Sequence, residues 1–301
     1  MASLLNRLIV FSLNFMPKSL VRRFAGRYIA GSSLSEAVKL IQELNRQGMM
    51  ATMDVLGEGI TQLGEARAAV EEYKRALHAI VEHKLDSNIS LKPTQFGLAL
   101  NPVVAEANIR EVVAEAHRLG IFVRIDMEDT PYTSATYELY LKLRREFPKL
   151  GTVMQAYLRR SHEDARRLLR EGNVNLRLCK GIYVEPRPLA YKDPALINQN
   201  YALVLEELIQ GGAYVGIATH DEKLVWEGLR VTRKFQLSRE QYEFQMLLGV
   251  DKQLRDIILA GKHRLRIYVP YGEQWYPYSM RRLRENPQVA MHIVKNLFTP
   301  G

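Results

Sequence analysis

Residues 121–127 read IFVRIDM and residues 151–157 read GTVMQAY, and the segment between them, 134–147 (SATYELYLKLRREF), carries apolar side chains at helical spacing. Short runs rich in Val, Ile and Tyr favour strands, whereas apolar residues three and four positions apart favour a helix. Two strands joined by a helical crossover pair in parallel, because parallel pairing needs a long connection. This stretch therefore predicts one strand–helix–strand unit.

The same alternation recurs from about residue 50 to the end of the chain and gives eight pairs, with no linker rich in Pro, Gly or Ser between the halves. Eight strand–helix pairs in succession predict a closed (β/α)8 barrel, the TIM-barrel fold of the α/β class. We place this barrel at 49–301 and a helical arm at 1–48. The predicted strands are 51–56, 89–92, 121–127, 151–157, 174–181, 214–219, 242–248 and 265–269, and the predicted helices are 66–84, 103–119, 134–147, 161–170, 194–209, 221–234, 251–260 and 278–298.

An open, doubly wound sheet is the alternative architecture. It would need a glycine-rich turn after its first strand, with an acidic residue at the end of the second. The local sequence is Gly57-Glu58-Gly59, which lacks the third glycine and that acid. The closed barrel is therefore the preferred prediction.

Two helix starts carry capping signals. Asn101 precedes Pro102, and Asn is a good N-cap while Pro is tolerated in the first turn. Ser161 opens the sequence Ser-His-Glu-Asp, which resembles a capping box. We expect both side chains to cap their helices.

Composition narrows the class of protein. The 301 residues are 47% apolar and 25% charged, which excludes a disordered or collagen-like chain. A single cysteine, Cys179, excludes an internal disulfide and a cysteine cluster for zinc. The net charge of +9 favours anionic partners. We expect no nucleic-acid binding, because no basic stripe is interleaved with aromatic residues.

The amino-terminal segment is basic and apolar. Its first acidic residue is Glu36, and five Lys or Arg residues precede it. No stretch reaches the roughly 20 apolar residues that span a bilayer. Two readings stay open: a helical arm packed on the barrel, or an amphipathic segment that contacts a membrane surface.

Polar side chains gather at the predicted strand ends, where (β/α)8 barrels build their active sites. A self-satisfied ring of salt bridges is the purely structural explanation, but buried ions need partners and a ligand could supply them. These residues are Asp54, Glu58, Lys92, Asp126, Glu128, Gln155, Arg177, Lys180, Thr219, His220 and Tyr268.

We expect no metal site, because Lys92, Arg177 and Lys180 would repel a divalent cation from the carboxylates. A lysine in a dry pocket could instead form a Schiff base. A class I aldolase-type lyase using Lys92 or Lys180 is therefore the alternative enzyme. Gly181 would also let a flat or phosphorylated ligand approach the backbone.

The last predicted helix presents Tyr278, Arg281, Arg282 and Glu285 on one face, at i, i+3, i+4 and i+7. Adjacent guanidinium groups offer planar, bidentate donors that fit a carboxylate. A solvated basic face is the alternative explanation.

Taken in chain order, these segments resemble the proline dehydrogenase family, in its monofunctional bacterial form. The resemblance runs from about residue 30 to the last helix, and ten motifs in order on successive strands are hard to obtain by chance. The motifs are AGSSLSEAV, MDVLGE, SLKPTQFG, RIDMED, MQAYLRRS, LRLCKGIYVEP, GIATHD, EFQMLLG, YVPYG and YSMRRLRENP.

The resemblance implies flavin-dependent oxidation of L-proline to Δ1-pyrroline-5-carboxylate, with a hydride passing from proline C5 to N5 of non-covalently bound FAD. It also implies that a membrane quinone reoxidises the flavin, and hence a cytoplasmic enzyme peripherally associated with the inner membrane. The family commonly has Ala where this chain has Ile182, which leaves the preference among proline analogues open.

By the same resemblance, Asp126 and Arg177 form the catalytic pair, and Glu58 closes the pocket by pairing with the first arginine of the last helix. The implied substrate-binding residues are Lys92, Leu247, Tyr268, Tyr278, Arg281 and Arg282. The implied FAD-binding residues are Met127, Gln155, Arg177, Lys180, Gly181, Ile182, Thr219 and His220.

Overall fold

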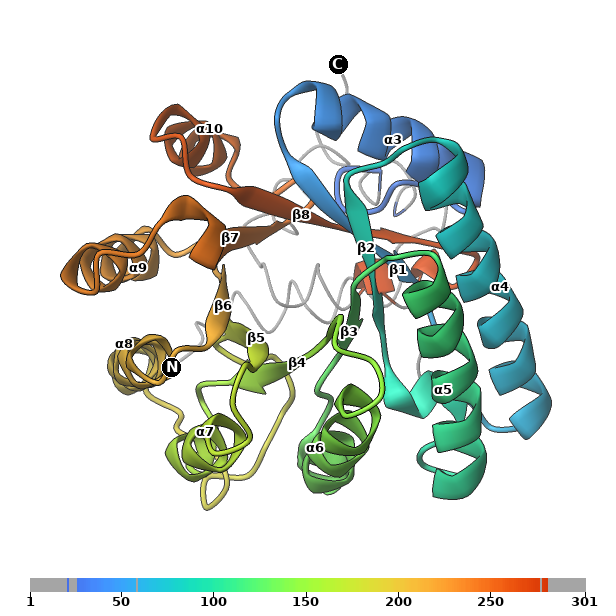
Figure 1. The fold of residues 1–301 in the computed structure, drawn as a ribbon, viewed down its shortest axis with the longest axis horizontal. Helices are drawn as coiled ribbons and strands as arrows, with labels where there is room; N and C mark the ends of the chain where they lie inside the picture. Colours follow the sequence, from blue (N-terminus) through green and yellow to red (C-terminus); the bar gives the residue numbers. More distant parts are fainter. Residues whose placement is uncertain (1–20, 22–25, 58, 277, 281–301) are drawn as a thin grey trace, which may run out of the picture.

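Eight parallel strands close into a barrel in the order β1 to β8 (Figure 1). The structure is a computed structural model that describes residues 21, 26–57, 59–276 and 278–280. The barrel prediction is confirmed, and no strand end differs from its predicted position by more than two residues. The strands are β1 (Met50–Val55), β2 (Ser87–Leu91), β3 (Val123–Ile125), β4 (Leu150–Gln155), β5 (Asn175–Cys179), β6 (Tyr214–Ala218), β7 (Tyr242–Leu247) and β8 (Leu265–Tyr271).

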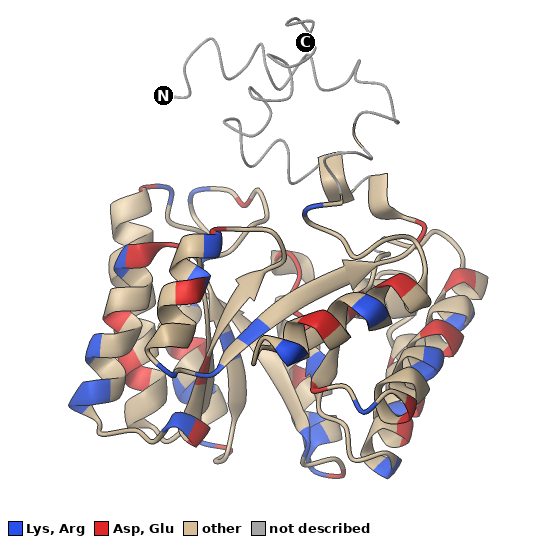
Figure 2. Cartoon of the chain, turned by 90° about the horizontal axis from the view of Figure 1, so that it is seen from above, with Lys and Arg blue, Asp and Glu red and all other residues tan. Residues whose placement is uncertain are grey.

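Helices surround the barrel. Within the described part of the chain, none is both long and apolar enough to cross a bilayer. Lys and Arg alternate with Asp and Glu along the helices visible in Figure 2, so the positive net charge is not a basic stripe on that face. The helices are α3 (Leu34–Arg46), α4 (Leu63–Glu82), η1 (Pro93–Phe96), α5 (Pro102–Arg118), α6 (Thr130–Arg144), α7 (Ser161–Leu169), α8 (Pro194–Gln210), α9 (Glu222–Lys234), η2 (Arg239–Gln241) and α10 (Lys252–Ala260).

Helix α3 belongs to the ring although it precedes β1. It packs against β1 and β8, between α10 and α4 (Figure 1). Its buried residues Ala37, Val38, Ile41 and Leu44 are part of the main hydrophobic core. The segment predicted as an arm at 1–48 therefore contains a helix of the barrel body. The predicted last helix, 278–298, lies outside the described residues from position 281 onward.

The barrel lumen is polar. Side chains alternate across a strand, so Val123 and Ile125 of β3 join the core while Arg124 and its neighbour Asp126 face the opposite way. Arg124 reaches from β3 to the Asn175 backbone oxygen on β5, a strand that is not its neighbour, at 3.0 Å. Only side chains that point into the lumen can make such a bond.

Of the two predicted caps, one is confirmed and one is wrong. The Asn101 side chain accepts hydrogen bonds from the backbone N–H groups of Val103 and Val104. At α7 the cap position is Arg160, and Ser161 lies inside the helix. The Ser161 hydroxyl instead accepts a hydrogen bond from the Asn200 side chain at 2.9 Å, which ties α7 to α8.

We expect Asn101→Ala to lower the free energy of unfolding by about 1 kcal/mol, because two backbone donors lose their acceptor. Asn101→Asp keeps a side-chain oxygen that can accept these bonds and is the matched control. Urea denaturation followed by circular dichroism measures both. An Ala variant as stable as the parent would contradict the capping role.

Candidate active site

A cavity of about 480 Å³ opens at the carboxyl ends of the strands. Every predicted substrate or flavin residue within the described part of the chain lines it. Glu58, Arg281 and Arg282 lie outside the described residues. The predicted residues on the wall are Lys92, Asp126, Met127, Gln155, Arg177, Lys180, Gly181, Ile182, Thr219, His220, Leu247, Tyr268 and Tyr278.

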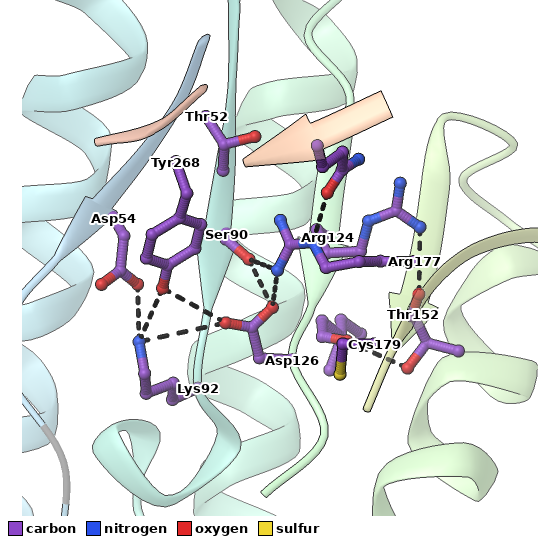
Figure 3. A network of polar contacts seen from close by, with 12 residues as sticks. Thr52, Asp54, Ser90, Lys92, Arg124, Asp126, Thr152, Arg177, Cys179 and Tyr268 are labelled. Atoms are coloured by element: carbon purple, nitrogen blue, oxygen red, sulfur yellow. Dashed lines mark hydrogen bonds and ion pairs between the residues drawn. The ribbon is translucent and has the colours of Figure 1, made fainter. Parts of the chain in front are cut away.

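Lys92 forms the first half of a buried ion network (Figure 3). Its Nζ donates to Asp54 Oδ1 at 2.7 Å and to the Tyr268 hydroxyl at 3.2 Å. The nearer carboxylate oxygen of Asp126 lies 3.9 Å away. Lys92 is thus held among an anion on β1, a phenol on β8 and a second anion beyond β3.

Arg177 forms the other half (Figure 3). Its Nη1 donates to Asp126 Oδ1 at 2.8 Å, and the Ser90 hydroxyl donates to the same oxygen at 2.5 Å. The guanidinium carbon lies 5.2 Å from the centre of the Tyr268 ring, within cation–π range. Asp126 therefore joins the two cations across the lumen.

The electrostatics of Lys92 argue against Schiff-base chemistry. Burial lowers the pKa of its amine, but the carboxylates of Asp54 and Asp126 outweigh burial, so the net pKa is raised. A nucleophilic lysine must be deprotonated, and Lys92 is held as a cation. Lys180, the other candidate, pairs with Asp221 at 2.6 Å.

Glu128 ties two loops of the site together. Its carboxylate accepts a hydrogen bond from the Thr94 N–H at 2.8 Å and one from the Thr94 hydroxyl at 2.5 Å. Burial raises the pKa of Glu128 to about 7, and the bonds from Thr94 offset only part of that effect. The link fixes η1, directly after Lys92, against the loop after β3.

The structure gives a reason for glycine at position 181 that the sequence did not reveal. Its φ of +116° is a conformation that side chains rarely adopt, and a Cβ there would lie 2.1 Å from the ring of Tyr157. The next residue, Ile182, donates its backbone N–H to Gln155 Oε1 at 3.3 Å. The Ile182 side chain is 38% exposed and lies on the cavity wall.

The sequence predictions assigned no role to several partners of these residues. Asp54 was noted only as a polar strand end, and Asp221 follows the predicted Thr219-His220 pair. Ser90 and Gln245 could have been found from the sequence. Ser90 stands two positions before Lys92, which directly follows β2, and Gln245 stands two positions after Glu243 on β7, so each points to the same side as that polar residue. Partners on distant strands cannot be identified from that spacing alone.

We predict that Glu128→Gln removes a pH dependence of stability. A carboxyl whose pKa rises from 4.5 to about 7 on folding binds more protons in the native state, so wild-type stability falls as pH rises between these values. The free energy of unfolding of Glu128→Gln relative to wild type should therefore increase by up to about 3 kcal/mol from pH 4.5 to 7.

Chemical denaturation at pH 4.5, 6 and 8 measures this difference, and Glu82→Gln, at the exposed last residue of α4, is the control. A difference between Glu128→Gln and wild type that stays constant with pH would refute the assignment.

Comparisons with known proteins agree on one family. A family model described as "Proline dehydrogenase" matches residues 37–294. Proline dehydrogenase 1 of Bacillus subtilis is 38% identical over 91% of this chain and 90% of its own length. Proline dehydrogenase of Deinococcus radiodurans is 32% identical over 91% of this chain and 89% of its own length.

The fold agrees as well. A crystal structure of proline utilization A from Bdellovibrio bacteriovorus, inactivated by N-propargylglycine, superposes with a TM-score of 0.81 at 26% identity. The match covers 87% of this chain but only 32% of that longer protein, whereas the Bacillus enzymes match over nearly their whole length. The chain therefore belongs to the proline dehydrogenase family.

Proposed function

We propose that this enzyme oxidises L-proline to Δ1-pyrroline-5-carboxylate with non-covalently bound FAD. The observation that carries the proposal is that residues assigned separately to substrate and to flavin, at strand ends from β2 to β8, line one and the same cavity. FAD bound in this cavity would supply, at N5, the acceptor for the hydride that leaves proline C5. The protein binds, orients and supplies charge around this chemistry.

The cavity residues fit a flavin. Apolar side chains of Met127, Met246 and Leu247 share the wall with the cations Arg177 and Lys180. A flat ring system that gains negative charge on reduction needs both kinds of surface. Arg177 and Lys180 would lie against the flavin, with Gln155, Ile182, Thr219 and His220 as further contacts.

The flavin would be held without a covalent bond to Cys179. This thiol also lines the cavity, but burial raises its pKa to about 12. A protonated thiol is a poor nucleophile.

The buried ion network would orient the substrate. Lys92 and Tyr268 present a cation and a phenol to the cavity, and Leu247 offers an apolar contact for the ring of proline. Asp126 already accepts hydrogen bonds from Ser90 and Arg177. These bonds support an orienting role for Asp126, and proline that binds as a neutral amine needs no dedicated base.

We further propose that Arg281 and Arg282 hold the carboxylate of proline and that Glu58 pairs with Arg281 when the pocket closes. The lumen cluster of Asp54, Lys92, Asp126 and Arg177 is balanced, with two negative and two positive side chains. An anionic substrate group therefore needs cations from outside this cluster. The arginine pair is the candidate that the sequence provides.

Electrons would then pass to a membrane quinone, which places the enzyme in the cytoplasm at the inner membrane. The basic, apolar segment before Glu36 supports a peripheral contact, because such segments bind anionic lipid surfaces. Flotation with anionic liposomes, with and without residues 1–20, tests this contact. Equal binding by both forms would remove the segment from the proposal.

The reaction is tested by the visible spectrum. Purified enzyme reconstituted with FAD should be yellow and should bleach when L-proline is added without oxygen. The flavin should be released by acid precipitation, because it is not covalently bound. A folded protein that takes up no FAD, or a Lys92 or Lys180 adduct trapped by borohydride, would contradict the proposal and favour the lyase.

We expect Arg281→Met or Arg282→Met to lower kcat/KM for proline. The loss should correspond to about 2 kcal/mol or more of transition-state stabilisation, the scale of a truncated buried ion pair. The reason is that the carboxylate of proline would lose a bidentate hydrogen-bond donor. Arg46→Met is the matched control, since this side chain is 73% exposed and lies on α3. Steady-state kinetics that do not distinguish the variants from the control would refute the assignment.

A further inference from the structure

We propose that Glu243 is a positioning residue for catalysis, which orients Arg177 through the side-chain amide of Gln245. The inference rests on the proposed function, in which Arg177 lies against the flavin. Glu243 itself does not line the cavity, whereas Gln245 and Arg177 do. The two residues on β7 thus connect the lower part of the barrel lumen to the active site.

The starting point is an ionised, fully paired carboxylate. Arg266 donates from Nε to Glu243 Oε1 at 2.7 Å and from Nη2 to Oε2 at 3.1 Å, and the Tyr214 hydroxyl donates to Oε2 at 2.9 Å. Burial raises the pKa of Glu243, but Arg266 outweighs burial and lowers it to about 2. The side chain is 2% exposed, so water does not substitute for these partners.

This carboxylate fixes which way the amide of Gln245 points. An ionised carboxylate can only accept hydrogen bonds, so the group 2.6 Å from Glu243 Oε1 must be the NH₂ of Gln245. A flipped amide would place two oxygen atoms at that distance. Because the NH₂ faces Glu243, the amide oxygen must face the other side of the lumen.

That oxygen accepts a hydrogen bond from Arg177 Nε at 2.6 Å. The same guanidinium is held at Nη1 by Asp126 and Ser90, at 2.8 and 3.3 Å. Two anchors on different nitrogen atoms fix the plane of a rigid guanidinium group. Without the Gln245 anchor, Arg177 could rotate about the remaining contacts with Asp126 and Ser90.

The orientation matters because Arg177 supplies positive charge to the cavity. A cation fixed beside a flavin stabilises the negative charge that the flavin gains on reduction, and a preorganised charge costs no reorientation during the reaction. Loss of the Gln245 anchor should therefore make the bound flavin harder to reduce and lower the rate of proline oxidation.

The test compares Glu243→Gln, Gln245→Met and the double variant with wild-type holoenzyme. An amide at position 243 can present either its oxygen or its NH₂, so it no longer dictates the direction of Gln245. Tyr214→Phe is the matched control, because it removes one bond to Glu243 and leaves the Arg266 and Gln245 contacts. Three measurements are made: the midpoint potential of bound flavin, kcat/KM for L-proline, and the denaturation midpoint.

Both single variants should lower the midpoint potential of the bound flavin. Both should also reduce kcat/KM for L-proline by about tenfold to a hundredfold, because a small misplacement of the Arg177 guanidinium at the active site has an effect of this size. The double variant should lose no more than the larger single effect, because both changes break one chain of contacts. Tyr214→Phe should keep the wild-type potential and kcat/KM.

Loss of stability in Glu243→Gln with unchanged potential and kcat/KM would overturn the proposal, and so would additive effects in the double variant. If Glu243→Gln does not fold, Gln245→Met decides alone: it keeps the Arg266–Glu243 pair, and a wild-type potential in it would overturn the proposal. Wild-type enzyme that does not bleach with proline would instead refute the proposed function.

Discussion

The structure depends on a charge balance inside the barrel. Asp54, Lys92, Asp126 and Arg177 are buried, and each anion lies within hydrogen-bond distance of a cation. An unpaired ion in such a place is costly, so removing one member leaves its partner in an unfavourable environment. The positions of these residues on β1 and β5 and directly after β2 and β3 are therefore constrained by one another.

The lumen of this barrel is filled with polar side chains that serve the active site, in place of apolar side chains that would stabilise the fold. Many (β/α)8 barrels fill the lumen with layers of branched apolar side chains, whereas this lumen holds ion pairs and amides. Buried ion pairs contribute little net stability compared with apolar residues of the same volume. Arg124 shows the cost, since burial lowers its pKa to about 9 and its Nε has no hydrogen-bond partner among the described residues. The stabilising apolar contacts lie instead between the strands and the helices.

The sequence predicted the elements well because their signals are local. Strand runs such as 151–157 and the cap at Asn101 depend on residues within a few positions of one another. The predicted bounds of β4 and the predicted start of α5 therefore lie within two residues of those in the structure. The start of α6 was missed by four residues, although Pro131 in its first turn is a usable signal. The prediction that Ser161 caps α7 is wrong, because its hydroxyl bonds to Asn200, a partner that is distant in the chain.

The sequence by itself determined the (β/α)8 order, the family and the set of polar strand ends. These features depend only on the order of residues along the chain, which the sequence contains in full. Only the tertiary structure decided that α3 joins the ring, that Lys92 pairs with Asp54, and that Gln245 faces Arg177. Such pairings depend on closure of the barrel, which brings the lumen side chains of non-adjacent strands within hydrogen-bond distance. No local pattern encodes that distance.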